Sequence, residues 1–344
     1  MNFYTLIFKK KLSYKSLISR FLIFTFIFIN IIALLNFLID PLRMFSHSNR
    51  FNNMQSDFDE RQQKTNNLYF VKSDYNNLIL GSSRSTYLNQ NYFYDKTFNY
   101  SANGMSPYEY EIFIDNFAKI TKKDIKKIII GIDFFGTAIE KNKDFIHENY
   151  LKNSMSFMYR YKNLYNLKLA KYSIKNIRQN FKTNKAYYSR DNVKFTPPNY
   201  VLDDKKKIIN SLVKFKQYEY DYRLKEYYFN LKNKYKNSEF IIFTMPITVN
   251  QLEEYEKNGL LESYFQWLND LVEVFGEVNH FAYPNKITQD LSYFFDAGHA
   301  LPKISIYMAD FIMNNDKQLD NFGIKLTKEN FNSFKKNYKL IKEE

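Results

Sequence analysis

Residues 77–83 read NLILGSS, a short run of apolar side chains that stops at Gly81 and is followed by Ser82 and Ser83. Two further runs of this kind are KIIIGI at 127–132 and EFIIFT at 239–244. Short, continuously apolar runs are typical of strands in a parallel sheet, because such a sheet is covered on both faces. The three runs therefore predict a buried parallel sheet. The glycine at the end of the first run predicts a sharp turn at the sheet edge.

Helical segments are expected between and after these strands. Residues 106–109, SPYE, have the elements of a capping box with proline at the first helical position, and predict a helix to about Thr121. Further helices are predicted from Asn250 to Phe275 and from Pro302 to about Met313. The alternation of strands and helices predicts an α/β domain with three layers, α/β/α.

The N-terminal region contains the longest apolar stretch. Phe21 to Ile39 is nineteen residues without a charge, close to the length that a helix needs to cross a hydrocarbon core of about 30 Å. The exit, residues 40–44, lacks the small residues of a signal-peptide cleavage site, which favours an uncleaved membrane anchor. The basic residues before it, Lys9 to Arg20, predict a cytoplasmic N-terminus and an extracytoplasmic domain.

The chain is thus expected to have five parts. These are a cytoplasmic basic tail (1–20), a transmembrane helix (21–39), a polar stalk (40–70), a catalytic domain (71–315) with a largely helical insertion at about 137–236, and a C-terminal helical tail (316–344).

The composition excludes several kinds of chemistry. The sequence contains no cysteine, so disulfides, thiol catalysis and cysteine-based zinc sites are ruled out. The net charge is +14, and the part beyond the basic tail is expected to be scattered, which suits an anionic envelope surface rather than nucleic acid. His47, His147 and His280 are isolated in the sequence, which favours packing or surface roles over metal binding. No glycine-rich phosphate loop is present, and no cofactor is expected.

Two clusters carry candidate chemistry. Ser82 and Ser83 follow a strand at a turn that would expose a hydroxyl above the carboxyl edge of the sheet. Asp296 and His299, spaced i and i+3, precede the predicted last helix, and a carboxylate at that spacing can orient an imidazole toward a nucleophile. Each pattern is common by itself. Their order, a serine after the first strand and Asp-x-x-His before the last helix, is more specific.

In these residues and their order, the sequence resembles the SGNH (GDSL-type) hydrolase and acyltransferase superfamily. Gly81-Ser82-Ser83 matches the Gly-Asp-Ser block with Ser82 in the aspartate place, so the resemblance implies Ser83 as nucleophile, with His299 as base and Asp296 as its orienting acid. Residues 99–104, NYSANG, match the block whose glycine, here Gly104, supplies an oxyanion-hole N–H beside that of Ser83.

The third block departs from the family pattern. Where the family has Gly-x-Asn-Asp, this chain has Gly131-Ile132-Asp133-Phe134. A carboxylate donates a hydrogen bond only when protonated, so Asp133 is a poor substitute for the oxyanion-hole asparagine. Two alternatives remain: Asp133 orients the serine loop, or a different group completes the oxyanion hole. Arg84 has two interpretations as well, as a ligand for an anionic substrate or as half of a structural ion pair.

The closest resemblance is to the membrane-anchored branch that contains the D-alanyl-transfer protein of teichoic-acid modification and the polysaccharide and peptidoglycan O-acetyltransferases. It implies a flavodoxin-like sheet and a serine acyltransferase or esterase that acts on O-acyl groups of cell-envelope glycans or glycolipids. A multi-pass membrane acyl exporter is the partner such transferases often use. The alternative is a catalytically silent scaffold of envelope polysaccharide assembly on the same fold.

Overall fold

The central element of the computed structural model is a six-stranded sheet with the order β10-β7-β6-β3-β1-β2. The structure describes residues 14–142, 149–183, 185–197, 210–213, 218–314, 319 and 321–338. The strands are β1 (Asn77–Gly81), β2 (Thr97–Asn99), β3 (Lys127–Gly131), β6 (Glu239–Phe243), β7 (Glu277–His280) and β10 (Ile324–Thr327). All neighbours pair in parallel except β10, which is antiparallel to β7. The three apolar runs of the sequence are β1, β3 and β6, and the predicted, mostly parallel sheet is confirmed.

Both faces of the sheet are buried, which explains why its strands are continuously apolar. Along β1, Leu78 and Leu80 join one hydrophobic cluster, and Ile79 joins the other. The first cluster is formed with α3 (Tyr110–Thr121), α9 (Arg223–Lys234) and α11 (Leu261–Phe275). The second is formed with α12 (Lys286–Gln289) and α13 (Ile304–Ile312). The catalytic candidates lie above this layered core, at the carboxyl ends of the strands.

The helix boundaries follow local capping. The predicted capping box at Ser106 and Glu109 is present, and the 3₁₀ turn Pro107–Glu109 continues into α3, which ends at Thr121. The helix expected over 250–275 is instead two helices, α10 (Val249–Lys257), capped by the Thr248 side chain, and α11. Gly259, with φ +68°, lies in the break between them. This conformation favours glycine and ends the first helix.

The C-terminal region is not only a helical tail. Ile324–Thr327 forms β10, which pairs with β7, and only α14 (Phe331–Asn337) is helical among the described residues that follow. The strand IKLT alternates in polarity, as an edge strand with one buried face does. It is too short to be distinguished from the helical pattern around it.

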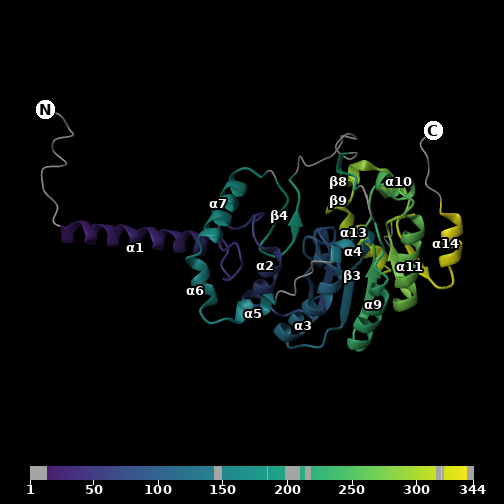
Figure 1. The fold of residues 1–344 in the computed structure, drawn as a ribbon, viewed down its shortest axis with the longest axis horizontal. Coiled ribbons are helices and arrows are strands. Elements are labelled where there is room, and N and C mark those ends of the chain that lie inside the picture. Colours follow the sequence, from purple (N-terminus) through teal and green to yellow (C-terminus); the bar gives the residue numbers. More distant parts are fainter. Residues whose placement is uncertain are drawn as a thin grey trace.

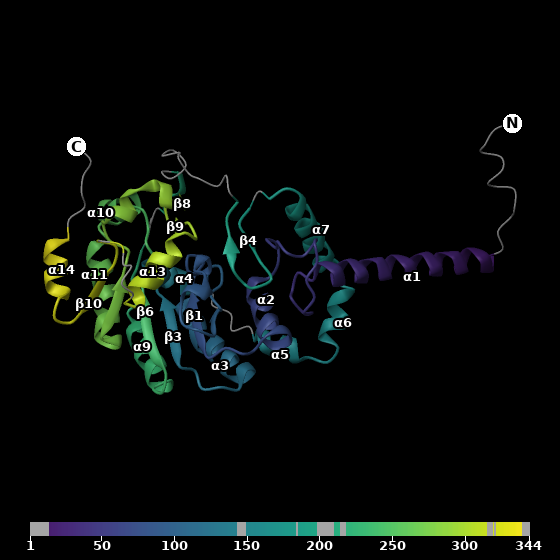
Figure 2. The same cartoon turned by 180° about the vertical axis from the view of Figure 1, so that it is seen from behind.

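One long apolar helix projects from the domain at the N-terminal end (Figures 1 and 2). It is α1 (Tyr14–Ile39), and only Ala33, Asn36 and Ile39 of it are buried. By length and hydropathy it is the one candidate membrane span among the described residues. Lys9, Lys10 and Lys11 of the basic flank lie outside those residues. An N-terminal apolar helix is thus present, as an anchor or a signal sequence requires.

The polar stalk expected over residues 40–70 is wrong. This segment contains α2 (Glu60–Asn66), whose residues 62–66 are all buried. It packs against α5 (Tyr150–Met155) in the insertion, which also holds α4 (Ile139–Asn142), α6 (Tyr159–Leu164), α7 (Leu167–Phe181) and the antiparallel pair β4 (Tyr187–Tyr188) and β5 (Lys194–Phe195). Buried amides explain the polar composition: Gln55 donates to the carbonyl of Ile39, and Gln63 donates to that of Pro41. A side-chain amide can be buried when backbone groups satisfy it.

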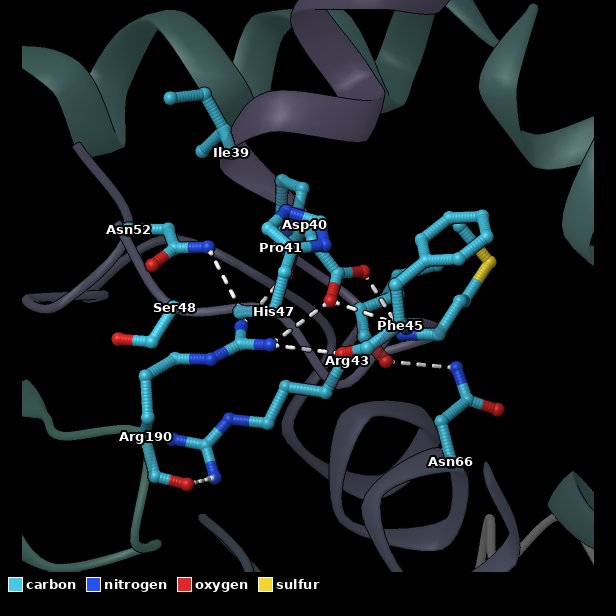
Figure 3. Close-up of polar contacts among 12 residues, drawn as sticks. Ile39, Asp40, Pro41, Arg43, Phe45, His47, Ser48, Asn52, Asn66 and Arg190 are labelled. Carbon is cyan, nitrogen blue, oxygen red and sulfur yellow. Dashed lines mark hydrogen bonds and ion pairs between the residues drawn. The ribbon is translucent and has the colours of Figure 1, made fainter. Parts of the chain in front are cut away.

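The junction between α1 and the domain is fixed by buried charges (Figure 3). Arg190, which follows β4, points its guanidinium at the Asp40 carboxylate (3.0 Å) and donates to the Phe45 carbonyl (2.9 Å). Arg43 donates in turn to the carbonyl of Arg190 (2.9 Å). Asp40 and Arg43 are 0% and 1% exposed. Breaking such a pair would leave an uncompensated buried charge, so the helix and the domain are held in one arrangement.

His280, at the end of β7, makes the fold sensitive to acid. Its ring nitrogens contact the hydroxyls of Thr244 and Tyr264, both at 2.9 Å, and burial lowers its pKa to about 3. The unfolded chain takes up a proton below about pH 6.5 that the folded chain does not. The free energy of unfolding therefore falls as the pH falls from 6.5 toward 3, by up to roughly 1.4 kcal/mol per pH unit.

Thermal melting of the full chain in detergent should show a steeper fall of the melting temperature between pH 6.5 and 4 for the wild type than for His280→Gln. Equal slopes for the two proteins would contradict the assignment of the acid sensitivity to His280.

Candidate active site

The turn after β1 is shaped by two glycines packed around one serine. Gly81 has φ +148°, and a β-carbon there would come within 2.9 Å of the Gly131 carbonyl and closer still to Ser85. A β-carbon on Gly131 would meet the same Ser85 hydroxyl and lie 2.7 Å from the Phe243 ring. Buried Ser85 therefore fits only because both strand ends carry glycine. The turn leaves Ser83 partly exposed above the sheet edge.

His299 and Asp296 come from a small hairpin at the same edge. Strands β8 (Phe294–Asp296) and β9 (His299–Ala300) are antiparallel, with Asp296 opposite His299. The Nε2 atom of His299 lies 2.8 Å from the Ser83 hydroxyl, and its Nδ1 atom lies 2.9 Å from both carboxylate oxygens of Asp296. The structure thus brings together the three side chains that the sequence singled out, although residues 83 and 296 are more than two hundred positions apart.

The carboxylate of this trio is held in its charged form. Burial by itself would raise the pKa of Asp296, but hydrogen bonding and charge from His299 and the N–H groups of Gly298 and His299 lower it below its usual value. Asp296 Oδ1 accepts from both N–H groups at 2.8 Å. The Phe295 ring stacks on the imidazole, with centroids 5.3 Å apart. Asp296 therefore holds the edge of the His299 ring, and Phe295 holds its face.

Asp133 holds the serine turn from the end of β3. It accepts a hydrogen bond from the Ser82 hydroxyl and pairs with Arg84 at 3.2 Å, so it binds the residues on both sides of Ser83. Of the two alternatives for Asp133, the contacts are those of a loop-orienting residue. Burial would lower the pKa of Arg84, but the Asp133 charge raises it. Arg84 is 7% exposed, and a β-carbon on Gly298 would lie 3.0 Å from its guanidinium. It is thus half of a structural ion pair, packed beneath the Asp296–His299 hairpin.

Gly104 lies in a tight turn next to the serine turn. The N–H of Ala102 donates to the Gly81 carbonyl (3.1 Å), and the Met105 N–H closes the turn onto Ala102. Gly104 is exposed, with φ +61°. Among the described residues, no hydrogen bond joins its N–H to Ser83. The structure therefore places Gly104 on the adjacent loop at the strand edge, and its role as an oxyanion donor stays a prediction.

Three charged residues of α2 bind the turn that contains Gly104. Glu60 accepts the Asn103 N–H, Arg61 donates to the Asn103 carbonyl (2.9 Å), and Lys64 donates to the Ser101 carbonyl (2.6 Å). Arg61 is itself fixed by two bonds to Glu109, at 2.6 and 2.8 Å. Interpretation of the sequence missed these residues because their segment was assigned to a stalk. The sequence signal that could have revealed them is their spacing: Glu60, Arg61 and Lys64 fall at positions i, i+1 and i+4 directly after Asp59, which caps the helix.

A charged residue of the insertion, which lies near the α2 charges, also contacts the serine turn. Lys194 of β5 donates to the Thr86 hydroxyl (2.8 Å), which donates to the Ser83 carbonyl (2.5 Å). Burial lowers the pKa of Lys64 to about 7, because this ammonium is fully desolvated. Burial opposes ionisation of Glu60, but Lys194 and Lys64 lower its pKa below its usual value. The cluster therefore places charges of both signs behind the two candidate loops.

The remaining histidines lie elsewhere. His280 is buried in the core, His47 packs against the Phe37 ring with centroids 4.8 Å apart, and His147 lies outside the described residues.

Comparison with known proteins adds no assignment: no protein-family model, no curated protein and no solved structure matches this chain.

The fit of Ser85 between two glycines can be tested by adding one methyl group. Gly131→Ala should destabilise the protein by about 1–3 kcal/mol, because its β-carbon overlaps Ser85 and Phe243. Gly136→Ala is the matched control, since its nearest neighbour would be Pro107 at 3.8 Å, an ordinary contact. Adding Ser85→Ala to Gly131→Ala should recover part of the loss in a thermal melt. A neutral Gly131→Ala would show that the turn is not packed as described.

Proposed function

We propose that this protein is a membrane-anchored extracytoplasmic serine acyltransferase or esterase of the SGNH type. Its substrates would be O-acyl groups of cell-envelope glycans or glycolipids. The observation that carries the proposal is the hydrogen-bonded chain Ser83–His299–Asp296, with 2.8 Å between hydroxyl and imidazole and 2.9 Å between imidazole and carboxylate. This is the arrangement that activates a serine for acyl transfer.

In the proposed mechanism, the Ser83 hydroxyl attacks the acyl carbonyl while His299 Nε2 takes its proton. Asp296 stabilises the imidazolium that forms. His299 then gives the proton to the departing alcohol oxygen as the carbon–oxygen bond breaks, which leaves an acyl-enzyme on Ser83. In the second half, His299 deprotonates water or a carbohydrate hydroxyl, which attacks the acyl-enzyme. His299 then returns the proton to the Ser83 oxygen as the bond between that oxygen and the acyl carbon breaks.

The place of the trio in the fold supports the proposal. If the strands of the main sheet are numbered in chain order, the parallel part has the order 2-1-3-4-5, which is the flavodoxin-like order. In such sheets ligands bind outside the carboxyl ends of the strands, where the strand order reverses. Here that point lies between β1 and β3. Ser83 follows β1, and Asp133 follows β3.

The departure at Asp133 leaves the oxyanion hole to backbone groups. Asp133 is occupied by Ser82 and Arg84, so the N–H groups of Ser83 and Gly104 are the proposed donors. The clamp of Glu60, Arg61 and Lys64 on the Gly104 turn suits that role, because an oxyanion hole works only when its donors are held before the reaction.

The proposed anchor is supported by the burial of the end of α1. Asn36, inside the apolar helix, is 0% exposed, and Asp40, just after it, forms the buried pair with Arg190. Cleavage in this region would remove residues on which the domain packs. An uncleaved, outward-facing anchor is therefore favoured over a signal sequence.

Labelling with a fluorophosphonate probe tests the catalytic assignment. The full-length protein in detergent should be labelled, and Ser83→Ala should abolish labelling because the nucleophile is lost. His299→Ala should slow labelling by several orders of magnitude. Ser82→Ala is the matched control and should retain labelling, since its hydroxyl contacts Asp133 rather than His299.

Retained labelling in Ser83→Ala would contradict the assignment of the nucleophile. No labelling of correctly folded wild-type protein would favour the alternative, a silent scaffold on this fold.

The α2 clamp gives a second test. Arg61→Gln should lower the rate constant of labelling at saturating probe about tenfold, or roughly 1.4 kcal/mol, because it frees the turn that holds Gly104. Arg61→Lys should recover part of the rate. The control is Lys335→Gln, which breaks an exposed ion pair with Glu262 on α11. A folding defect would instead lower the fraction of protein that labels and leave the rate constant unchanged.

A further inference from the structure

The net charge of the chain is concentrated in two segments. Residues 1–20 contain five Lys and Arg, residues 150–185 contain nine, and neither segment contains Asp or Glu, so together they account for the whole net charge of +14. The positive charge beyond the tail is therefore not scattered, as the sequence had suggested. Seven of the nine lie on α5, α6 and α7, and Lys182 and Lys185 follow α7. The rest of the chain is electrically balanced.

The same helices and the turn between α5 and α6 carry exposed apolar side chains. Phe157, Leu167 and Phe181 are 85%, 62% and 69% exposed, and Met155, Tyr161 and Ile174 are also exposed. On α7 the exposed positions 167, 171, 174, 178 and 181 follow helical spacing and alternate between apolar and basic residues. A helix with apolar side chains among lysines and arginines is typical of segments that lie in a membrane interface.

The position of these helices against α1 supports that interpretation. Both α6 and α7 pack on α1 and lie beside its end (Figures 1 and 2). The Asn36 side chain donates to the carbonyls of Leu164 (2.8 Å) and Asn166 (3.1 Å) and accepts from Ser173 (2.9 Å). The contacts therefore reach from the end of α1 up to Asn36 and the buried Ala33.

The length of α1 then places α6 and α7 at the membrane surface. The charge-free stretch 21–39 is about 28 Å long, and a hydrocarbon core of about 30 Å requires nearly all of it. Residues 33–39 are about the last 9 Å of that stretch; among them Ala33, Asn36 and Ile39 are buried, and α6 and α7 pack on this helix. The covering helices cannot stand clear of a bilayer that α1 spans.

We propose that α6 and α7 form a platform that lies in the bilayer interface, with Leu167, Ile174 and Phe181 among the acyl chains and the lysines on anionic phospholipid headgroups. This proposal rests on the proposed membrane anchor and adds an orientation to it. The platform leads through β4 and β5 to Lys194, which bonds the serine turn by way of Thr86. The trio would then be held at a fixed height above the membrane, where a lipid-linked substrate presents its glycan.

The absence of native cysteine allows single labels to test the platform. A fluorophore is attached at Ile174→Cys on α7, at Leu34→Cys on α1 and at Phe229→Cys on α9, all exposed positions. The full chain is reconstituted in vesicles of phosphatidylcholine and phosphatidylglycerol that contain a nitroxide lipid. Labels at positions 34 and 174 should lose most of their fluorescence, and the label at 229 should keep it. Lys168, Lys171 and Lys175 changed together to Gln should reduce the loss at 174.

The other outcomes distinguish a failure of the platform from a failure of the anchor. Quenching at 34 but not at 174 would overturn the platform and leave the anchor intact, whereas quenching at neither position would overturn both. A label at 174 that is shielded from aqueous iodide yet not reached by the nitroxide would mean that protein, such as a second copy of the chain, covers this face, and would also overturn the proposal. Equal quenching at 174 in vesicles of phosphatidylcholine alone would overturn the part assigned to anionic headgroups.

Discussion

The buried ion pair between Arg84 and Asp133 is the contact on which the candidate site depends. Asp133 lies at the end of β3, and Arg84 lies one residue after Ser83, so the pair joins two adjacent strand ends across the serine turn. The Arg84 guanidinium also fills the space beneath Gly298 of the hairpin that carries His299. A buried charge of this kind tolerates little displacement, because either partner alone would be left unpaired in the protein interior.

A second set of buried charges connects the apolar helix to the same loops. Asp40 and Arg190 fix the end of α1 on the insertion, and Lys194, four residues further on, bonds the serine turn. From the other side, α2 clamps the turn that contains Gly104. The segment between the helix and the sheet domain is therefore a structural part of the candidate site. It ties the geometry of the loops to the orientation of α1.

The sequence predicted the parts of the fold that depend on local pattern. The apolar runs of β1, β3 and β6 identified the parallel sheet, and the capping box at Ser106 identified the start of α3. Ser83, Asp296 and His299 were singled out by residue type and order, and the structure brings them into hydrogen-bond contact; their catalytic role stays a prediction. The burial of residues 40–44 and 62–68 was missed, since buried Gln and Asn side chains have the composition of a solvated linker and only tertiary partners distinguish the two. The partners of Arg84, Asp133 and Lys64 lie 37 to 51 positions away in the sequence, beyond any local pattern.

Under the resemblance to the SGNH pattern, the two departures from it are best understood as one. The first block carries Ser82 where the family has aspartate, and the third carries Asp133 where it has asparagine. In the structure these two side chains hydrogen-bond to each other, so under that resemblance the carboxylate is retained on the opposite side of one contact. The exchange keeps an acidic anchor for the turn and supplies the partner for Arg84. It also removes the side-chain amide that would donate to an oxyanion. Under the proposed function that task falls to the backbone N–H groups of Ser83 and Gly104. A turn used in this way must be held from outside, and Glu60, Arg61 and Lys64 hold it.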